Sequence, residues 1–332
     1  MSTIERKDIE RAYKLLKSYY YYDNNMTLNT KIAIAEYECS NILGNKNWAE
    51  EFKEKYLVSS EKEKNIEEKI KKISVVRVVK SIEPEKNIKN YEEKSKSYEE
   101  KFQLLTNKPN IEFDINYNYL IDAPVEIHIL SMLWIMKEGY LLDLKISDDI
   151  YGSRLEINKE YECIDKYKKN VFKLYHKQYS LWRDKALKRV SDIINKEDSN
   201  AVLINLDIKR YYYNIELEKL YKNILNVNEN LDTFLFSCIQ KINKFYNKKI
   251  RELVKNEGDI KEIEKNKGLP IGLLSSQVLA NFYLIDFDNE VSKLLPDYYG
   301  RYVDDVLIIF KDRENYKDKD VKLEKYYRWK IG

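Results

Sequence analysis

The stretch GRYVDDVLIIF, residues 300–310, places two adjacent carboxylates, Asp304 and Asp305, inside an otherwise apolar segment. The hydrophobic pattern on both sides of the pair predicts a strand–turn–strand hairpin with the aspartates at its tip. Burying a charge without a partner is so unfavourable that such a charge is usually paired or bound to a metal ion. The fold therefore has to provide something that neutralises these two carboxylates.

A third acidic side chain ends a second apolar run. AVLINLDI, residues 201–208, is compact and β-branched and predicts a buried strand with Asp207 at its C-terminal end. Between the two acidic segments, GLPIGLLSSQVLANFYL, residues 268–284, predicts a glycine-bounded loop and a helix that begins at about Ser275. If the strand ends lie side by side, the carboxylates of Asp207 and Asp304 come within about 5 Å of each other, the reach of a shared metal pair.

Three carboxylates that close would repel one another unless divalent cations lie among them. Two Mg²⁺ ions, or Mn²⁺ in their place, at a separation of roughly 3.5–4 Å activate an attacking hydroxyl and stabilise a leaving pyrophosphate. A hard, oxygen-binding ion also fits the absence of histidine and cysteine from these segments. The sequence therefore predicts a two-metal site built on Asp207, Asp304 and Asp305.

The bulk composition sets wider bounds. A chain of 332 residues has room for roughly two or three domains. Charged residues make up 35% of it but the net charge is only +3, so composition alone does not identify a nucleic-acid-binding protein. Three isolated cysteines and two histidines exclude a zinc site or a disulfide framework. The sequence has neither the apolar core of a signal peptide nor a membrane-length apolar run, so we expect a cytoplasmic protein without a membrane partner.

The N-terminal third is charge-rich. Residues 4–22 place apolar side chains at helical spacing and predict an amphipathic helix. From 50 to 105 the dense Lys and Glu residues predict solvated helix faces or a connector, with no role in the core. The apolar stretch 124–144 predicts a buried helix that ends at Gly139.

A basic and aromatic stretch precedes the first acidic strand. Between Lys166 and Arg189, nine basic residues meet one acidic residue, Asp184, and aromatic side chains are interspersed among them. Cations for phosphates and rings for bases are what a nucleic-acid channel requires. The alternative is an amphipathic helix with a buried aromatic face and solvated lysines.

The motifs together resemble a known family. LDIKRYYYNI, GLPIGLLSSQVLANFYL and RYVDDVLIIF are similar, in this order, to the A, B and C motifs of reverse transcriptases, and the resemblance covers about residues 140–312. RAYKLLKSYYYYD, IYGSRL and LYHKQYSLWRDKAL resemble segments of the bacterial abortive-infection and defence-associated members.

The resemblance implies an α+β fold. We expect a right-hand polymerase palm, with a small antiparallel sheet and helices, at 199–332, a fingers-like segment at 126–198 and a helical, charge-rich region at 1–125. The family normally continues into a helical thumb, but only residues 311–332 follow Phe310. We therefore expect an incomplete palm without a thumb. Either the chain is truncated, or the missing parts come from another chain, or the protein has lost its activity.

The resemblance also assigns roles to the acidic segments. Asp207 and Asp304 would be the main metal ligands with Asp305 beside them, and Ile208 would offer its backbone carbonyl. Tyr212 falls where the family has an aromatic steric gate, whose ring excludes a ribose 2′-OH and so selects deoxynucleotides. A packed core aromatic is the alternative for Tyr212, and the neighbouring Tyr211 is the alternative gate.

The nucleotide-binding positions are carried over in the same way. Gly268 and Gly272 would let the backbone approach the nucleotide, and Pro270 would stiffen the turn. Ile271 stands where many members have Gln, which removes a hydrogen bond near the incoming base. The remaining candidates for contacts with nucleotide or template are Gln277, Arg154, Lys173 and Arg183.

The function expected from this resemblance is RNA-directed DNA polymerisation in antiphage defence. Its partners would be an RNA template or structured non-coding RNA, a DNA or protein primer, dNTPs, and a partner chain or a second copy. The alternatives are an inactive palm that serves as a nucleic-acid-binding or scaffold subunit, and a template-independent deoxynucleotide transferase.

Overall fold

The computed structural model describes residues 4–23, 26–84, 113–158, 160–231, 233–256 and 264–312. The chain forms two compact units, each built from two segments: unit 1 is Met1–Ser131 with Phe234–Ser276, and unit 2 is Met132–Thr233 with Gln277–Gly332. Because both units are discontinuous, these boundaries differ from the three consecutive segments expected from the sequence. The expected division into N-terminal region, fingers and palm stays a prediction.

The N-terminal part of unit 1 is helical. Its α-helices are α1 (Arg6–Tyr22), α2 (Leu28–Tyr37), α3 (Trp48–Lys53) and α4 (Lys62–Ile70). Single π-helical turns, Glu38–Ile42 and Glu54–Val58, follow α2 and α3. The amphipathic helix predicted at 4–22 is confirmed by α1, whose Ile9, Leu16 and Tyr20 are buried.

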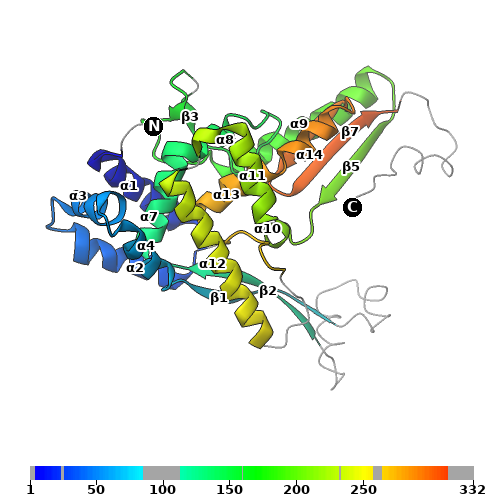
Figure 1. The fold of residues 1–332 in the computed structure, drawn as a ribbon. Helices are drawn as coiled ribbons and strands as arrows, with labels where there is room; N and C mark the ends of the chain where they lie inside the picture. Colours follow the sequence, from blue (N-terminus) through cyan, green and yellow to red (C-terminus); the bar gives the residue numbers. More distant parts are fainter. Residues whose placement is uncertain are drawn as a thin grey trace. The chain divides into compact units, whose positions relative to one another are not determined.

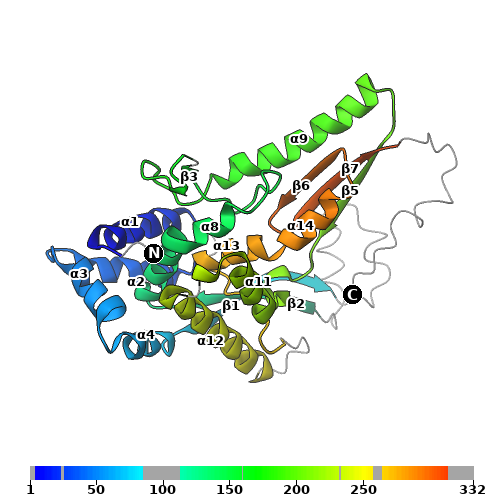
Figure 2. The same ribbon diagram turned by 45° about the horizontal axis from the view of Figure 1, so that its top comes forward.

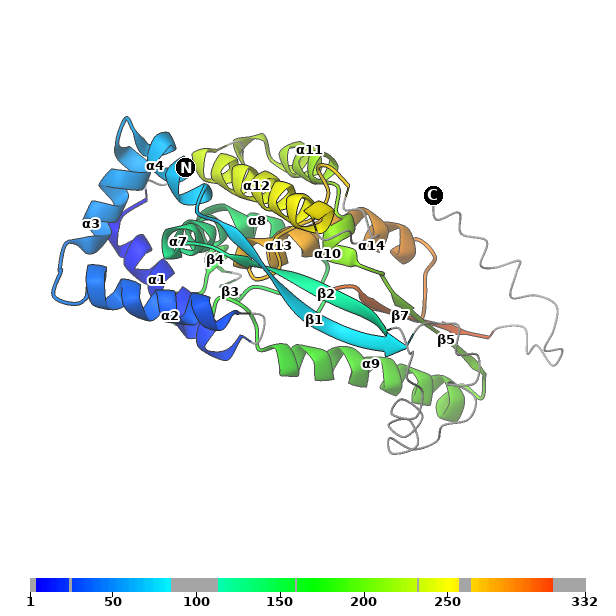
Figure 3. The same ribbon diagram turned by 90° about the horizontal axis from the view of Figure 1, so that it is seen from below.

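Unit 1 also contains a long antiparallel ribbon. β1 (Ser74–Pro84) pairs with β2 (Phe113–Asp122), and the register of the pairing shifts between Val79 and Ser81. Figure 3 shows the two strands twisting about each other. The prediction of helices or a connector is wrong over Ser74–Pro84. The Lys and Glu content of the long window hid the β-branched run VVRVV, which favours a strand.

The C-terminal part of unit 1 supplies helix α12 (Phe234–Asn256), which lies next to β1 (Figure 1). Its buried positions repeat every three or four residues, as in Ile239, Ile242 and Tyr246. The chain passes between the units three times: within α7 (Val125–Trp134), at the start of α12, and within α13 (Leu274–Tyr283).

The helix predicted at 124–144 continues beyond Gly139. After α7 comes a π-helical turn, Ile135–Gly139, and then α8 (Tyr140–Asp143). Gly139 has helical torsion angles, φ −60° and ψ −30°, so it does not end the helix. A Cβ atom there would come within 3.0 Å of the Trp134 ring, so we attribute the glycine to close packing.

The principal sheet of unit 2 has the strand order β5–β7–β6, with β5 (Ala201–Asp207), β6 (Tyr298–Tyr302) and β7 (Asp305–Lys311) all antiparallel to their neighbours (Figure 2). Helix α9 (Tyr175–Lys196) lies along one face, where Ala186 and Ile193 cluster with Ile309. Helix α14 (Ile285–Ser292) contacts the other face through Asp288.

The strand predicted at 201–208 is confirmed, but the prediction that it is buried is wrong. Leu203 and Leu206 are 46% and 42% exposed. In this sheet β5 is an edge strand, paired on one side by β7, and an apolar run alone does not distinguish an edge strand from a central one.

The remaining elements of unit 2 are short except for α11. They are β3 (Ile157–Asn158), β4 (Cys163–Ile164), α10 (Tyr211–Asn214), α11 (Leu217–Val227) and the 3₁₀ turn Glu229–Leu231. Helices combined with small antiparallel sheets confirm the α+β class and agree with a polymerase palm. Within the described ranges, every helix is too short or too polar to cross a membrane.

Candidate active site

The two adjacent aspartates lie at the tip of a tight hairpin, as predicted. β6 and β7 pair up to Tyr302 and Asp305, which leaves Val303 and Asp304 as the two turn residues. Val303 has φ +59°, a left-handed conformation that is unfavourable for a β-branched side chain. Such a conformation persists only where neighbouring groups hold it, and it is common at functional sites.

The third aspartate lies directly across the sheet from this hairpin. Asp207, the last residue of β5, pairs in register with Asp305, the first residue of β7. The next backbone amide, that of Ile208, donates to the Asp304 carbonyl at 3.3 Å. Directly opposed side chains of an antiparallel pair lie on the same face, with Cβ atoms about 5 Å apart. The sheet therefore brings Asp207 beside the aspartate pair, while the expected carboxylate separation between Asp207 and Asp304 stays a prediction.

Electrostatic repulsion is already evident in this pair. Asp305 is half-buried, and partial burial together with the negative charge of Asp207 raises the pKa of its carboxyl group. A cation between the two carboxylates would remove the unfavourable interaction.

The donor set fits a hard divalent cation. It consists of oxygens alone: the carboxylates of Asp207, Asp304 and Asp305 and the carbonyl of Ile208. Among the residues that the structure describes, no three acidic, histidine or cysteine side chains are already grouped closely enough to hold a metal ion.

The three consecutive tyrosines of α10 differ in their surroundings. Tyr211 is buried and its hydroxyl donates to the Ala280 carbonyl, and Tyr213 is also buried. Tyr212 is only partly buried, with its ring edge-on to that of Tyr211 at 5.8 Å between centroids. The environment of Tyr211 is that of a packed core aromatic, so Tyr212 remains the better candidate for the gate.

The glycine-bounded loop belongs to unit 1. Gly268 and Gly272 both have φ +97°, which explains why glycine is needed at each position. Pro270 is buried, and the Ile271 carbonyl accepts from the Ile121 amide of β2 at 2.9 Å. The backbone at position 271 is therefore held by β2.

Sequence reasoning missed the residue that holds the start of this loop. The buried Asn247 of α12 donates from Nδ2 to the carbonyls of Glu264, at 3.0 Å, and Lys267, and its Oδ1 accepts from the Asn266 amide. An asparagine in the apolar repeat of α12 was the available signal. Gln277 lies in unit 2, where its side chain accepts from Ser153 Oγ at 3.3 Å.

The three basic candidates have different environments. Arg154 is buried, ion-paired to Asp143 at 3.0 Å, and donates to the carbonyls of Ser147 and Ile150, which does not support its predicted contact with nucleotide. Arg183 is exposed on α9 and pairs with the adjacent Asp184 at 2.8 Å. Lys173 precedes α9 and is half-buried. The difference was not visible in the sequence, because burial of an arginine depends on the carbonyls that the fold turns toward it.

The stretch 166–189 contains both buried and exposed aromatic side chains, and its role as a nucleic-acid channel stays a prediction. Trp182 is buried and its Nε1 donates to the Gly300 carbonyl at 3.0 Å, so this ring belongs to the core. Tyr175 is 73% exposed, whereas Tyr179 packs edge-on to Tyr302 with 5.4 Å between ring centroids. Because Tyr302 is the partner of Asp305, aromatic side chains of α9 reach the edge of the acidic site.

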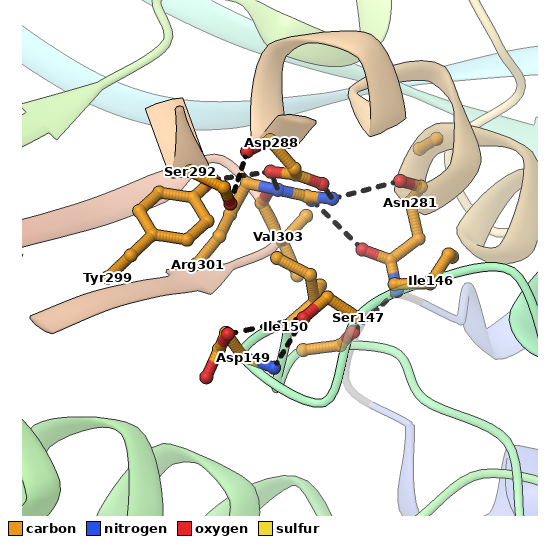
Figure 4. Close-up of polar contacts among 12 residues, drawn as sticks. Ile146, Ser147, Asp149, Ile150, Asn281, Asp288, Ser292, Tyr299, Arg301 and Val303 are labelled. Atoms are coloured by element: carbon orange, nitrogen blue, oxygen red, sulfur yellow. Dashed lines mark hydrogen bonds and ion pairs between the residues drawn. The ribbon is translucent and has the colours of Figure 1, made fainter. Parts of the chain in front are cut away.

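A buried polar cluster behind the hairpin was also missed. Figure 4 shows Arg301 between Asp288 and Asn281, with Val303 next to its guanidinium. The available signal was a charged residue within the otherwise uncharged strand β6, which requires a buried partner elsewhere in the chain.

Comparison with protein families supports the arrangement of motifs. Residues 148–329, more than half of the chain, match the model of the family described as reverse transcriptase (RNA-dependent DNA polymerase). This range contains all three aspartates, the glycine-bounded loop and the hairpin. A search among curated proteins found no match.

Proposed function

Because the chain belongs to the reverse transcriptase (RNA-dependent DNA polymerase) family, we propose that it extends a primer with deoxynucleotides on an RNA template by a two-metal mechanism. The observation that carries the proposal is the register of the sheet, which sets Asp207 opposite Asp305 with Asp304 in the adjoining turn. Repulsion between Asp207 and Asp305 is the expected signature of a site that holds cations.

In this mechanism the chain holds and orients the reacting groups. Asp207 and Asp304 would be the main ligands of two Mg²⁺ ions, or of Mn²⁺ in their place, with Asp305 and the Ile208 carbonyl beside them. When bound, the ions supply the charge that activates the primer hydroxyl and stabilises the leaving pyrophosphate. Tyr212 would exclude nucleotides that carry a 2′-OH.

The nucleic-acid contacts fall to α9 and the residues before it. Exposed Tyr175 offers a ring for stacking, and Lys173 and Arg183 offer cations for phosphates or template. The template would be an RNA, with a DNA or protein primer and dNTPs as the other substrates. The resemblance of RAYKLLKSYYYYD and LYHKQYSLWRDKAL to defence-associated members supports a role in antiphage defence in the cytoplasm.

The test is a primer-extension assay with RNA template, DNA primer, dNTPs and Mg²⁺ or Mn²⁺, comparing the wild type with Asp304→Asn. Synthesis that follows the template and disappears in Asp304→Asn supports the proposal. Incorporation of deoxynucleotides without a template would favour a transferase instead. Tight binding of nucleic acid with no synthesis under either metal would favour a scaffold subunit.

A further inference from the structure

The guanidinium of Arg301 is fully buried, with 0% of the residue exposed, and each of its N–H donors has an acceptor. Nε and Nη2 donate to the two carboxylate oxygens of Asp288, both at 2.7 Å. Nη2 also donates to the Asn281 carbonyl at 3.0 Å, and Nη1 donates to Asn281 Oδ1 at 2.9 Å. The last donor, on Nη1, bonds the Val303 carbonyl at 2.8 Å. A planar fork bound this way has a single orientation.

That last bond reaches the strained turn of the hairpin. The Val303 carbonyl belongs to the peptide that joins Val303 to Asp304, so Arg301 fixes the plane of the peptide leading into the predicted metal ligand. Because Val303 has φ +59°, the turn needs such support to keep its conformation.

A second element restrains the same turn from another direction. A Cβ atom on Gly152 would lie 2.6 Å from both Cγ2 and the amide nitrogen of Val303, so only glycine leaves room for the turn. Gly152 is itself bound to the polar cluster, since its carbonyl accepts from Asn281 Nδ2 at 2.9 Å.

The loop that carries Gly152 is also attached to the backbone of β6. Arg301 donates its amide to the Asp149 carbonyl at 3.1 Å, and its carbonyl accepts from the Tyr151 amide at 2.8 Å. In Figure 4 this loop passes below Arg301 and Val303. The main chain and side chain of one residue therefore join α13, α14, the loop and the hairpin turn.

We propose that Arg301 is a positioning residue that fixes the Val303–Asp304 peptide and thereby aims the Asp304 carboxylate at the metal site. The inference rests on the proposed two-metal function. It adds that the Asp288–Arg301–Asn281 cluster, which packs behind the hairpin, determines the orientation of Asp304. Mutation of a group that orients a metal ligand typically costs about 10–100-fold in metal affinity or activity.

The test measures Mn²⁺ affinity by the electron paramagnetic resonance signal of the free ion, together with the melting temperature, on the full chain. Arg301→Lys keeps the charge but loses the fork, and Gly152→Ala displaces Val303 in a protein that retains the arginine at position 301. In both variants we expect Mn²⁺ to bind about tenfold to a hundredfold more weakly than in the wild type. The control is Leu220→Ala, which opens a cavity at a fully buried position of α11 and should lower the melting temperature but not the Mn²⁺ affinity.

Asn281→Ala serves as the second test of the cluster if Arg301→Lys does not fold, because it removes one guanidinium acceptor and leaves the Asp288 pair intact. It should weaken Mn²⁺ binding less than Gly152→Ala does. Variants that melt earlier but bind Mn²⁺ as tightly as the wild type would reduce Arg301 to a structural residue and overturn the inference. A wild type without Mn²⁺ binding that depends on Asp304 would instead overturn the proposed function, and this inference with it.

Discussion

The two acidic elements of unit 2 are supported very differently. The hairpin that carries Asp304 and Asp305 rests on the buried Arg301 cluster, and its strand β7 is central in the sheet. Asp207 is exposed and ends an edge strand, β5, whose Leu203 is nearly half exposed. The hairpin side of the site is thus fixed by the interior of the fold, whereas the Asp207 side depends on its pairing with β7.

Although the two sides of the site are supported differently, we expect Asp207 and Asp304 to be equally important for synthesis. Asp207→Asn and Asp304→Asn each keep the shape of the side chain and remove one negative charge from the proposed metal site. Metal-borne charge stabilisation is worth several kcal/mol and each 1.4 kcal/mol is about tenfold, so synthesis should fall roughly a thousandfold or more in either variant. Primer extension measures the effect.

Nucleic-acid affinity is the control for these variants. The basic residues of α9 are unchanged, and removing an acid slightly favours a polyanion, so filter binding over a range of salt should be as tight as in the wild type. If Asp207→Asn extends a primer normally while Asp304→Asn does not, Asp207 is not a ligand and only the hairpin side of the site is correct.

A matched pair of residues tests the difference in packing. Leu203 and Ile309 lie directly opposite each other on β5 and β7, yet Ile309 is fully buried. Ile309→Ala should lower the free energy of unfolding by about 2–5 kcal/mol, whereas Leu203→Ala should change it by roughly 0.5 kcal/mol. Urea unfolding of both variants measures this. Equal losses of unfolding free energy in the two variants would mean that Leu203 is buried in solution. β5 would then be packed as well as β7, and the difference in support between the two sides of the site would disappear.

The sequence predicted those parts of the site in which a residue with a specific chemical or conformational role stands out from its immediate neighbours. The hairpin around Asp304, strand β5 with its terminal Asp207 and the glycines of the loop could all be located, because a carboxylate in an apolar run or a glycine in a turn usually has a specific chemical or conformational role. Arg301 could be seen as a charge in a strand, but its partner Asp288 lies on a helix, α14, and such pairings depend on tertiary structure.

Burial was the property that the sequence predicted least well. β5 and β7 are similarly apolar, yet strand order leaves one at the edge and the other in the centre. Arg154 and Arg183 were both candidates for contacts with nucleotide or template, yet only Arg154 is turned toward interior carbonyls. Neither distinction is a property of the local segment, so neither could be derived from periodicity or composition.

The Asp207 side of the site also predicts substrate selection. If Tyr212 is the gate, Tyr212→Val should raise ribonucleotide incorporation relative to deoxynucleotide incorporation by about ten- to hundredfold, or 1.4–2.8 kcal/mol, because a steric block is removed. Competition assays with paired nucleotides measure the ratio. Tyr211→Phe is the matched control, since it removes only the hydroxyl bonded to Ala280 and should leave selectivity unchanged. Unchanged selectivity in Tyr212→Val would move the gate to Tyr211 or refute it.

The smallest expected effect concerns the contact between the two sides, where Asp305 faces Asp207. Burial and the charge of Asp207 raise the pKa of Asp305, so its ionised form is less favourable in the folded protein than in the unfolded chain. This carboxylate therefore destabilises the fold above its folded-state pKa, and the penalty vanishes as the pH falls below the unfolded value of about 3.9. Asp305→Asn should melt slightly higher than the wild type at pH 7, and the difference should shrink as the pH falls through the folded-state pKa of Asp305. Mg²⁺ should reduce the difference at pH 7 by stabilising the wild type more than the variant. A wild type that is more stable than Asp305→Asn at pH 7 without metal would contradict this prediction and would show that other groups of the protein outweigh the repulsion from Asp207.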